Sequence, residues 1–275
     1  MNFIKALALG LVVAASSFSD LPAAEPPGQI AISPSMFEIP IGPRPTTRSI
    51  RLKNLKKSPV ILKVEIYNWT LDGNNELTET PPTLQSLDQW MVINPLEFTI
   101  EPGKEQVVRF SIRPRIAPEP GEHRAIIYFN EQPSASNSGG VELLFRIGVG
   151  IYAYADPIIR KGTLSALTLD RKRKTISAEL ANRGNVHTRF KGNYAIWQKG
   201  TFPGFKNITA GLNLKPGEDK PVGFIAAGAM NNSPVLAGTQ RSVYTAIPLP
   251  DTEGVSYDVA VQGKVGDMKI EKLFP

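Results

Sequence analysis

Residues 141–152 read VELLFRIGVGIY and have the strongest period-two pattern in the chain. The odd-numbered positions are all apolar, whereas the even-numbered ones include Glu142, Arg146 and two glycines. This alternation is typical of a β-strand that buries one face. The apolar row covers about 11 residues, roughly 36 Å of extended chain, which is longer than a usual strand. Its members are Val141, Leu143, Phe145, Ile147, Val149 and Ile151.

Shorter segments of the same kind recur along the chain, separated by turn residues. The 275 residues include 24 prolines and 23 glycines, together about 17% against roughly 12% in average soluble proteins. No segment of about twelve residues combines helical periodicity with helix caps, so we predict an all-β fold. Further strands are expected at Ser49–Leu52, Val60–Trp69, Val107–Ile112 and Ala125–Asn130.

An internal repeat divides the chain into two related halves. Asn54 and Trp69 are 15 positions apart, and so are Asn182 and Trp197. In each half a Pro-Gly turn, at residues 102–103 and 216–217, leads into a strand that ends in phenylalanine. We therefore expect two Ig-like β-sandwiches, with these asparagines at strand ends and these tryptophans between the sheets. Because proline cannot continue a central strand, Pro157 marks the boundary between domains at 25–156 and 157–275.

Residues 1–24 have the organisation of a secretory signal peptide. Lys5 supplies the initial positive charge, residues 6–15 form a short apolar centre, and Ala23 or Ala24 provides the small residue at the cleavage site. About ten apolar residues are too few to span a bilayer as a helix. We expect an exported protein without membrane insertion.

The net charge of +6 does not indicate nucleic-acid binding. Removal of residues 1–24 takes away one basic and one acidic side chain, so the charge is unchanged. The longest basic run, residues 171–174, falls at an expected turn between strands, where it is solvated. Nucleic-acid binding would need a basic stripe with interleaved aromatic residues and normally a cytoplasmic location, whereas we expect this chain to be exported, so we expect no nucleic-acid partner.

The composition also argues against an enzyme. The chain has no cysteine, which excludes disulfides, thiolate metal sites and cysteine nucleophiles. Its two histidines, His123 and His187, are 64 positions apart, and neither belongs to a metal-ligand or Ser-His-Asp pattern. We expect no enzymatic activity, no metal and no cofactor.

The apolar row at 141–151 leaves two interpretations open. It fits a long central strand with one face in the core of its own sandwich. It also fits an edge strand that pairs with another protein, in which backbone hydrogen bonds provide affinity and alternate side chains enter pockets of the partner. The pattern alone does not distinguish the two.

Several segments between residues 30 and 157 together resemble a known family. They are the strand expected at 32–39, Asn54 with Pro59, FTIEPG at 98–103 leading into VVRF at 107–110, YFN at 128–130, and the alternating strand that runs towards Pro157. In combination they resemble the periplasmic chaperones of pilus assembly, the PapD-like chaperones of the chaperone–usher pathway. The second half of the chain matches that family only in general form.

The resemblance implies two Ig-like domains in a boomerang arrangement and a periplasmic, non-enzymatic chaperone. In this family the chaperone inserts alternate residues of its long edge strand into pilus subunits that lack their last strand, until an outer-membrane usher exchanges it. The implied partners are therefore pilus or fimbrial subunits and an usher. By position, the residues of the donor strand are Val141, Leu143, Phe145, Ile147 and Val149.

One departure from the family pattern concerns the carboxylate anchor. Family members hold the carboxyl terminus of the subunit with an arginine in the first strand and a lysine at the end of the donor strand. The aligned residues are Met36 and Tyr152, which cannot form charge-assisted bonds. Candidates to replace the anchor are Arg146, Arg48 and Arg51.

A second departure concerns the ion pair between the domains. The family has an acid before the aromatic-Phe-Asn segment and a base before the linker proline, and here the aligned residues are Arg124 and Asp156, with the signs reversed. We expect these two side chains to form a salt bridge at the domain junction.

Alternative functions are a secreted two-domain Ig-like structural or adhesive protein and, less consistent with the motifs, a β-sandwich hydrolase or carbohydrate binder. A structural module would bury the apolar face of residues 141–151, whereas a chaperone leaves part of it exposed. The sequence also leaves open a homodimer in which the exposed strands of the two copies cover each other.

Overall fold

The computed structural model describes residues 29–133, 143–208, 212 and 218–275. The predicted signal peptide at 1–24 and Val141 lie outside the described residues. The first group of strands is β1 (Ile30–Ser33), β2 (Met36–Pro40), β3 (Thr46–Asn54), β4 (Val60–Leu71), β5 (Leu77–Thr80), β6 (Met91–Asn94), β7 (Glu97–Ile100), β8 (Glu105–Ile112), β9 (Gly121–Glu131) and β10 (Arg146–Ala155). The second group is β11 (Gly162–Asp170), β12 (Thr175–Asn182), β13 (Phe190–Gln198), β14 (Phe224–Ala229), β15 (Gln240–Ala246), β16 (Tyr257–Val265) and β17 (Met268–Phe274).

These strands form two β-sandwiches, which confirms the predicted all-β fold class. In the first sandwich, a sheet in the order β1-β3-β8-β6 packs on a sheet in the order β2-β10-β9-β4-β5, with β7 also paired to β4. In the second, the sheets are β11-β12-β15 and β14-β13-β16-β17. Two short 3-10 helices, at Leu87–Trp90 and Phe205–Asn207, complete the regular structure among the described residues.

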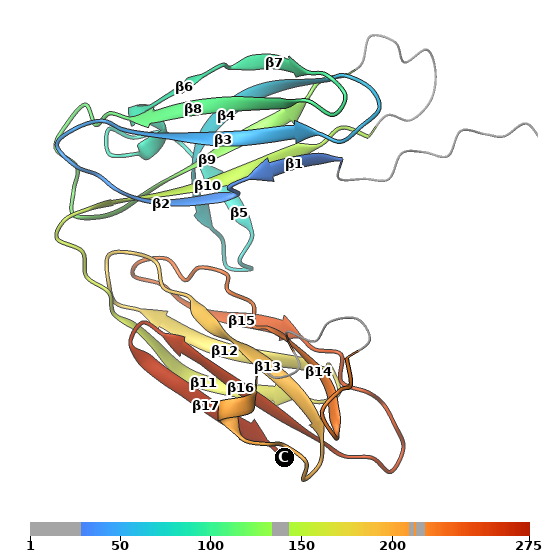
Figure 1. Cartoon of the computed structure of the whole chain (residues 1–275). Helices are drawn as coiled ribbons and strands as arrows, with labels where there is room; N and C mark the ends of the chain where they lie inside the picture. Colours follow the sequence, from blue (N-terminus) through green and yellow to red (C-terminus); the bar gives the residue numbers. More distant parts are fainter. Residues whose placement is uncertain (1–28, 134–142, 209–211, 213–217) are drawn as a thin grey trace, which may run out of the picture.

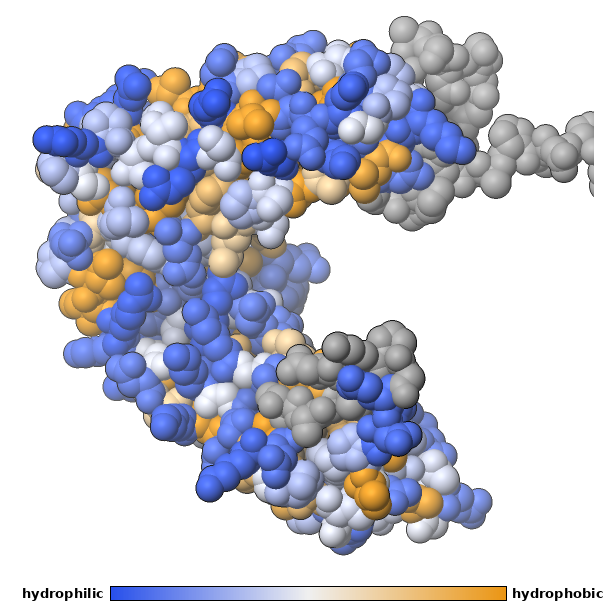
Figure 2. Space-filling model, in the orientation of Figure 1, coloured by the Kyte–Doolittle hydropathy of each residue, from blue (hydrophilic) through white to orange (hydrophobic). Residues whose placement is uncertain are grey.

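The two sandwiches meet at one end and diverge from it (Figure 1). Figure 2 shows the open hollow that this leaves between them, which is the predicted boomerang arrangement. β10 is the last strand of the first sandwich and ends at Ala155, and β11 begins the second at Gly162.

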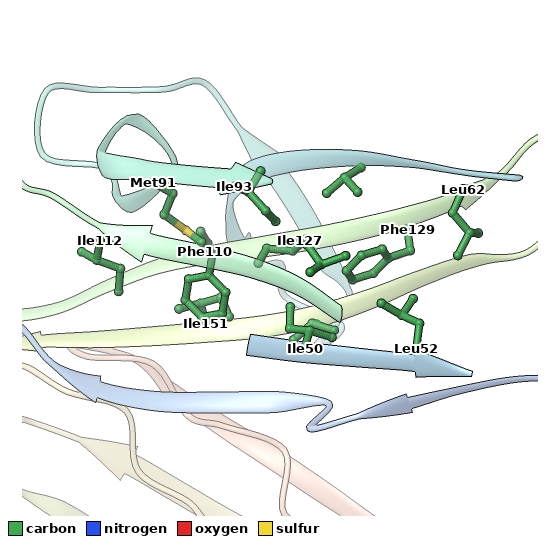
Figure 3. Packing of buried hydrophobic residues seen from close by; sticks show 14 of the residues in the cluster. Ile50, Leu52, Leu62, Met91, Ile93, Phe110, Ile112, Ile127, Phe129 and Ile151 are labelled. Carbon is green, nitrogen blue, oxygen red and sulfur yellow. The ribbon is translucent and has the colours of Figure 1, made fainter. Parts of the chain in front are cut away.

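Each sandwich has its own hydrophobic core, as period-two strands require. In the first, residues from both sheets interdigitate, among them Ile50, Phe110, Ile127 and Phe129 (Figure 3). Strand β10 contributes Val149, Ile151 and Ala153 to the same core. The second core is built in the same way around Ile176, Phe190, Ile196 and Val259.

The internal repeat is visible in the bonding of two asparagines. Asn54 ends β3 and Asn182 ends β12, as predicted. The Asn54 amide donates to the carbonyls of Ser58 and Ile100, each at 2.8 Å, and its oxygen accepts from the backbone of Lys56. The Asn182 amide donates in the same manner to Val186 and Val235, at 2.8 and 2.9 Å, and its oxygen accepts from Gly184.

The prediction for the tryptophans is wrong in one respect. Trp69 and Trp197 are buried, but both lie on the outer face of their sheets and not between the sheets. Trp69 packs at the junction of the two sandwiches, beside Tyr152 and Val186. Trp197 is covered by the aromatic side chains of Phe202, Phe205 and Phe224.

Candidate functional site

One edge of the first sandwich is only half covered. Strand β2 pairs with β10 in parallel, but only over the register from Gly150 to Tyr154. The preceding part of β10, residues 146–149, pairs with β9 on one side. In the part of the chain that the structure describes, no strand pairs with its other side, because β1 leaves this sheet and joins β3 in the opposite one.

The direction of the free backbone groups follows from the alternation along the strand. The Gly150 amide donates to the Ser35 carbonyl on the β2 side at 3.3 Å. Because successive residues direct their N–H and C=O groups to opposite sides, those of Arg146 and Gly148 also point to this side. They form a short free edge that is able to accept another strand.

The apolar row emerges from the core along this free edge. Ile151 and Val149 are both 0% exposed, Ile147 and Phe145 are half-buried, and Leu143 is 69% exposed. Val149 therefore packs in the core of this chain and is not available to a partner, which corrects its assignment to the donor residues. Leu143, Phe145 and Ile147 keep that assignment as a proposal.

The predicted strand begins too early. Residues 143–145 are described but do not belong to a strand, and β10 begins at Arg146. The ladder with β9 ends because β9 itself ends at Glu131, whose N–H donates to the Phe145 carbonyl at 2.9 Å. A salt bridge of 2.5 Å to Lys56 holds the Glu131 carboxylate at this end of the sheet.

The charge of Arg146 is already neutralised. Its guanidinium forms a salt bridge of 2.7 Å with Glu79 and stacks on the Tyr128 ring at 3.6 Å. Of the other two candidate anchors, Arg51 pairs with Glu105 at 3.1 Å, and Arg48 is exposed on β3, in the opposite sheet. The structure does not bring these three arginines together.

The cation that lies beside Met36 and Tyr152 comes from the second sandwich. The Arg189 guanidinium donates to the Met36 sulfur at 3.3 Å and lies 5.3 Å from the centre of the Tyr152 ring. Sequence reasoning missed this residue, because Arg189 is outside the region of resemblance and only the packing of the two sandwiches brings it to the first.

A buried polar network joins the two sandwiches at the same end. The carboxylate of Glu122, on β9, accepts hydrogen bonds from the Nδ1 atom of His187 at 2.5 Å and from its backbone N–H at 3.0 Å. Arg189 Nε donates to His187 Nε2 at 3.0 Å, so the imidazole proton is on Nδ1. Burial raises the pKa of Glu122, but the hydrogen bonds from His187 and the charge of Arg124 outweigh it and lower that pKa below its usual 4.5.

The predicted ion pair between Arg124 and Asp156 is wrong. Arg124 pairs with Glu122 at 3.0 Å, and no ion pair joins it to Asp156 in the described part of the chain. Arg124 lies opposite Tyr152 in the ladder. Asp156 follows four positions later, about 13 Å further along an extended chain, and it is exposed.

Two general features bear on the type of site. No helix among the described residues has the length and apolar character needed to cross a membrane. The same residues contain no group of three or more His, Asp or Glu side chains arranged to hold a metal ion.

Comparisons with known proteins give structural matches alone. No protein-family model matches the chain, and no curated protein matches it. The YadV chaperone superposes with a TM-score of 0.47 at 11% identity, over 90% of this chain and 99% of that one. The class 5 fimbriae chaperone CfaA superposes with a TM-score of 0.45 at 14% identity, over 90% of this chain and 99% of that one. The Pseudomonas aeruginosa CupB2 chaperone superposes with a TM-score of 0.44 at 12% identity, over 89% of this chain and 97% of that one. These superpositions cover most of each chain, at low sequence identity.

Proposed function

We propose that this protein is a non-enzymatic periplasmic chaperone. It holds an incomplete β-sandwich subunit of a pilus or fimbria on the free edge of β10 and passes it to an outer-membrane usher. One observation carries the proposal: one side of the backbone of residues 146–149 has no strand partner, and the apolar side chains of the same segment pass from the core to the surface. Backbone groups and apolar side chains are thus offered at the same place, as strand addition requires.

The energy available at this edge suits a reversible complex. If a subunit covers about 100 Å² on each of Leu143, Phe145 and Ile147, the gross hydrophobic gain is on the order of 7 kcal/mol at about 25 cal/mol per Å². Ordering of the partner and of residues 143–145 offsets part of this gain. A subunit held in this way is protected from aggregation and can still be exchanged for a better-fitting strand.

Co-purification tests the proposal. Wild-type protein and the variants Leu143→Ser and Ile147→Ser are co-expressed in the periplasm with a candidate subunit that lacks its last strand. We expect at least a tenfold lower yield of complex for each variant, because the serine cannot fill an apolar pocket of the subunit.

Leu144→Ser is the matched control, since Leu144 is also exposed, at 44%, but belongs to the even-numbered positions. Its yield should equal that of the wild type. Equal yields for all variants would instead favour the two-domain structural or adhesive protein, in which this row serves only the chain's own packing.

A further inference from the structure

A pocket of about 200 Å³ lies beside the domain junction and concentrates positive charge. Its wall is formed mainly by the second sandwich, and Glu38 on β2 is the contribution of the first. Two carboxylates, of Glu38 and Asp267, line it against five cations, which gives a net charge of +3. The five cations are Arg160, Lys161, Arg189, Lys191 and Lys264.

None of these five cations forms an ion pair in the part of the chain that the structure describes. The salt bridges found there use other arginines and lysines, such as Arg51, Lys56 and Arg146. Five like charges around one hollow repel each other, and this repulsion is reduced if an anion enters.

Arg189 is held in place by neutral groups. Its guanidinium donates to the Asn232 carbonyl at 2.8 Å, to His187 Nε2 at 3.0 Å and to the sulfur of Met36. The side chain is half-buried, so its charge is partly removed from water. Among the described residues no carboxylate pairs with it directly, although Glu38 lies 3.6 Å from the same His187 Nε2 atom. A fixed guanidinium without a direct ion pair is prepared to bind an oxyanion with little loss of side-chain entropy.

The backbone around the pocket is shaped by glycines. A Cβ atom at Gly162 would lie 2.2 Å from the Thr188 hydroxyl, so only glycine allows β11 to approach this wall. Gly266 has a φ of +56° and lies in the turn between β16 and β17, which contains Asp267 and directly follows the end of β16 that carries Lys264.

We propose that this pocket binds a doubly charged oxyanion of phosphate chemistry. Three of the five cations are lysines, and the net charge of the lining is +3. Because a lysine ammonium acts as a point charge, this lining fits a compact dianion better than it fits a single carboxylate ligand. The site is separate from the free edge of β10, and its occupation does not depend on the proposed chaperone function.

Calorimetric titration with inorganic phosphate at about pH 8, where the dianion dominates, tests the proposal, with acetate at equal ionic strength as the monoanion. We expect binding of phosphate and at least fivefold weaker binding of acetate. Lys191→Gln and Lys264→Gln should each weaken phosphate binding about thirtyfold, the effect of removing one charge about 4 Å from a dianion in water. Glu38→Gln should strengthen binding, because it removes a negative charge from the wall.

Lys172→Gln is the matched control, because it makes the same change in net charge at an exposed turn away from the pocket. The proposal is overturned if phosphate gives no heat at millimolar concentration, if acetate binds equally well, or if Lys172→Gln weakens binding as much as Lys191→Gln.

A second titration identifies the source of the phosphate group. Vesicles of phosphatidic acid, whose phosphomonoester headgroup can carry two negative charges, would assign the pocket to lipid headgroups if they bind the protein and are displaced by inorganic phosphate. If these vesicles bind no better than phosphatidylcholine vesicles while free phosphate still binds, the pocket takes a small soluble anion.

Discussion

Glu122 is a single residue that ties the two sandwiches together, and its titration should be visible in their stability. Its side chain is fully buried and receives hydrogen bonds from His187 and a salt bridge from Arg124. Because the pKa of Glu122 in the folded protein lies below its usual 4.5, its contribution to the stability of the folded protein is complete above about pH 4.5. The contribution is lost as the pH falls through the lower, folded-state pKa.

The variant Glu122→Gln should therefore be less stable than the wild type at neutral pH, and the difference should shrink as the solution is acidified below about pH 4.5. Thermal denaturation over a series of pH values measures it. The exposed Glu97→Gln should show no such trend. A difference that stays constant down to about pH 3 would show that the Glu122 carboxylate is not stabilised in the folded state.

The paired asparagines give a second prediction at this scale. Asn182→Ala leaves the carbonyl of Val186 and the amide of Gly184 without this partner, and it removes one of the two hydrogen bonds to the carbonyl of Val235, which also accepts from the Thr188 N–H. We expect a loss of about 3 kcal/mol in the free energy of unfolding, measured by urea denaturation. Asn74→Ala, at an exposed turn, should change that free energy by less than about 0.5 kcal/mol. Similar values for both variants would contradict the structural role of Asn182.

Single residues could be predicted from the sequence where their behaviour is local. Asn54 and Asn182 end strands because an asparagine bonds to the backbone two residues later, and this depends only on nearby residues. Which face of its sheet Trp69 or Trp197 occupies depends on what covers the outer side of that sheet. The residue that pairs with Arg124 depends on the register of the strands. Arg189 reaches Met36 only through the packing of two domains, which no spacing in the sequence encodes.

At the scale of elements, β10 shows what a periodic pattern predicts and what it leaves out. The alternation correctly places Ile147, Val149 and Ile151 on the core side of the strand and Arg146 on the outer side. It does not predict where pairing begins, because that depends on the ends of β9 and β2. The length of the free edge therefore depends on three strands, β2, β9 and β10.

Gly148→Pro tests this edge directly. Proline removes the N–H that points away from β9, so the ladder with β9 stays intact while the free edge loses a donor. We expect an unchanged melting temperature, within about 3 °C, and at least tenfold weaker binding of a subunit in a pull-down assay. Gly148→Ala adds the same Cβ, close to the flexible end of Ile126, but keeps the N–H and should bind normally. Equal binding by both variants would exclude strand addition at this position.

At the scale of the whole molecule, the hollow between the sandwiches depends on a junction with three kinds of contact. An apolar cluster includes Trp69 and Tyr152 of the first sandwich and Val186 and Leu236 of the second. The Glu122 network lies beside it. At the turn between β4 and β5, Arg241 donates to the carbonyls of Leu71 and Asp72 and to the side chain of Asn75.

Loss of the Arg241 contacts should widen the range of angles between the sandwiches. These contacts lie at the turn between β4 and β5, away from the linker at residues 156–161. A contact far from the linker restricts rotation of the sandwiches about it more than a contact close to the linker. In Arg241→Ala the apolar cluster and Glu122 remain, so the two bodies should stay together with a broader distribution of separations. Because the chain has no native cysteine, spin labels attached to Lys104→Cys and Lys172→Cys report this distribution by pulsed electron resonance.

Arg171→Ala is the appropriate comparison for this experiment. Arg171 also donates to three backbone carbonyls, those of Tyr257, Phe274 and Pro275, but all of them belong to the second sandwich. Its removal should lower stability without changing the width of the distance distribution. If Arg241→Ala gives the same width as the wild type, the apolar cluster and the Glu122 network are sufficient to fix the angle. A broader distribution in Arg241→Ala alone would show that the Arg241 contacts at the turn between β4 and β5 fix the angle between the sandwiches. The subunit that we propose to bind at β10 would then meet a preformed surface on the second sandwich.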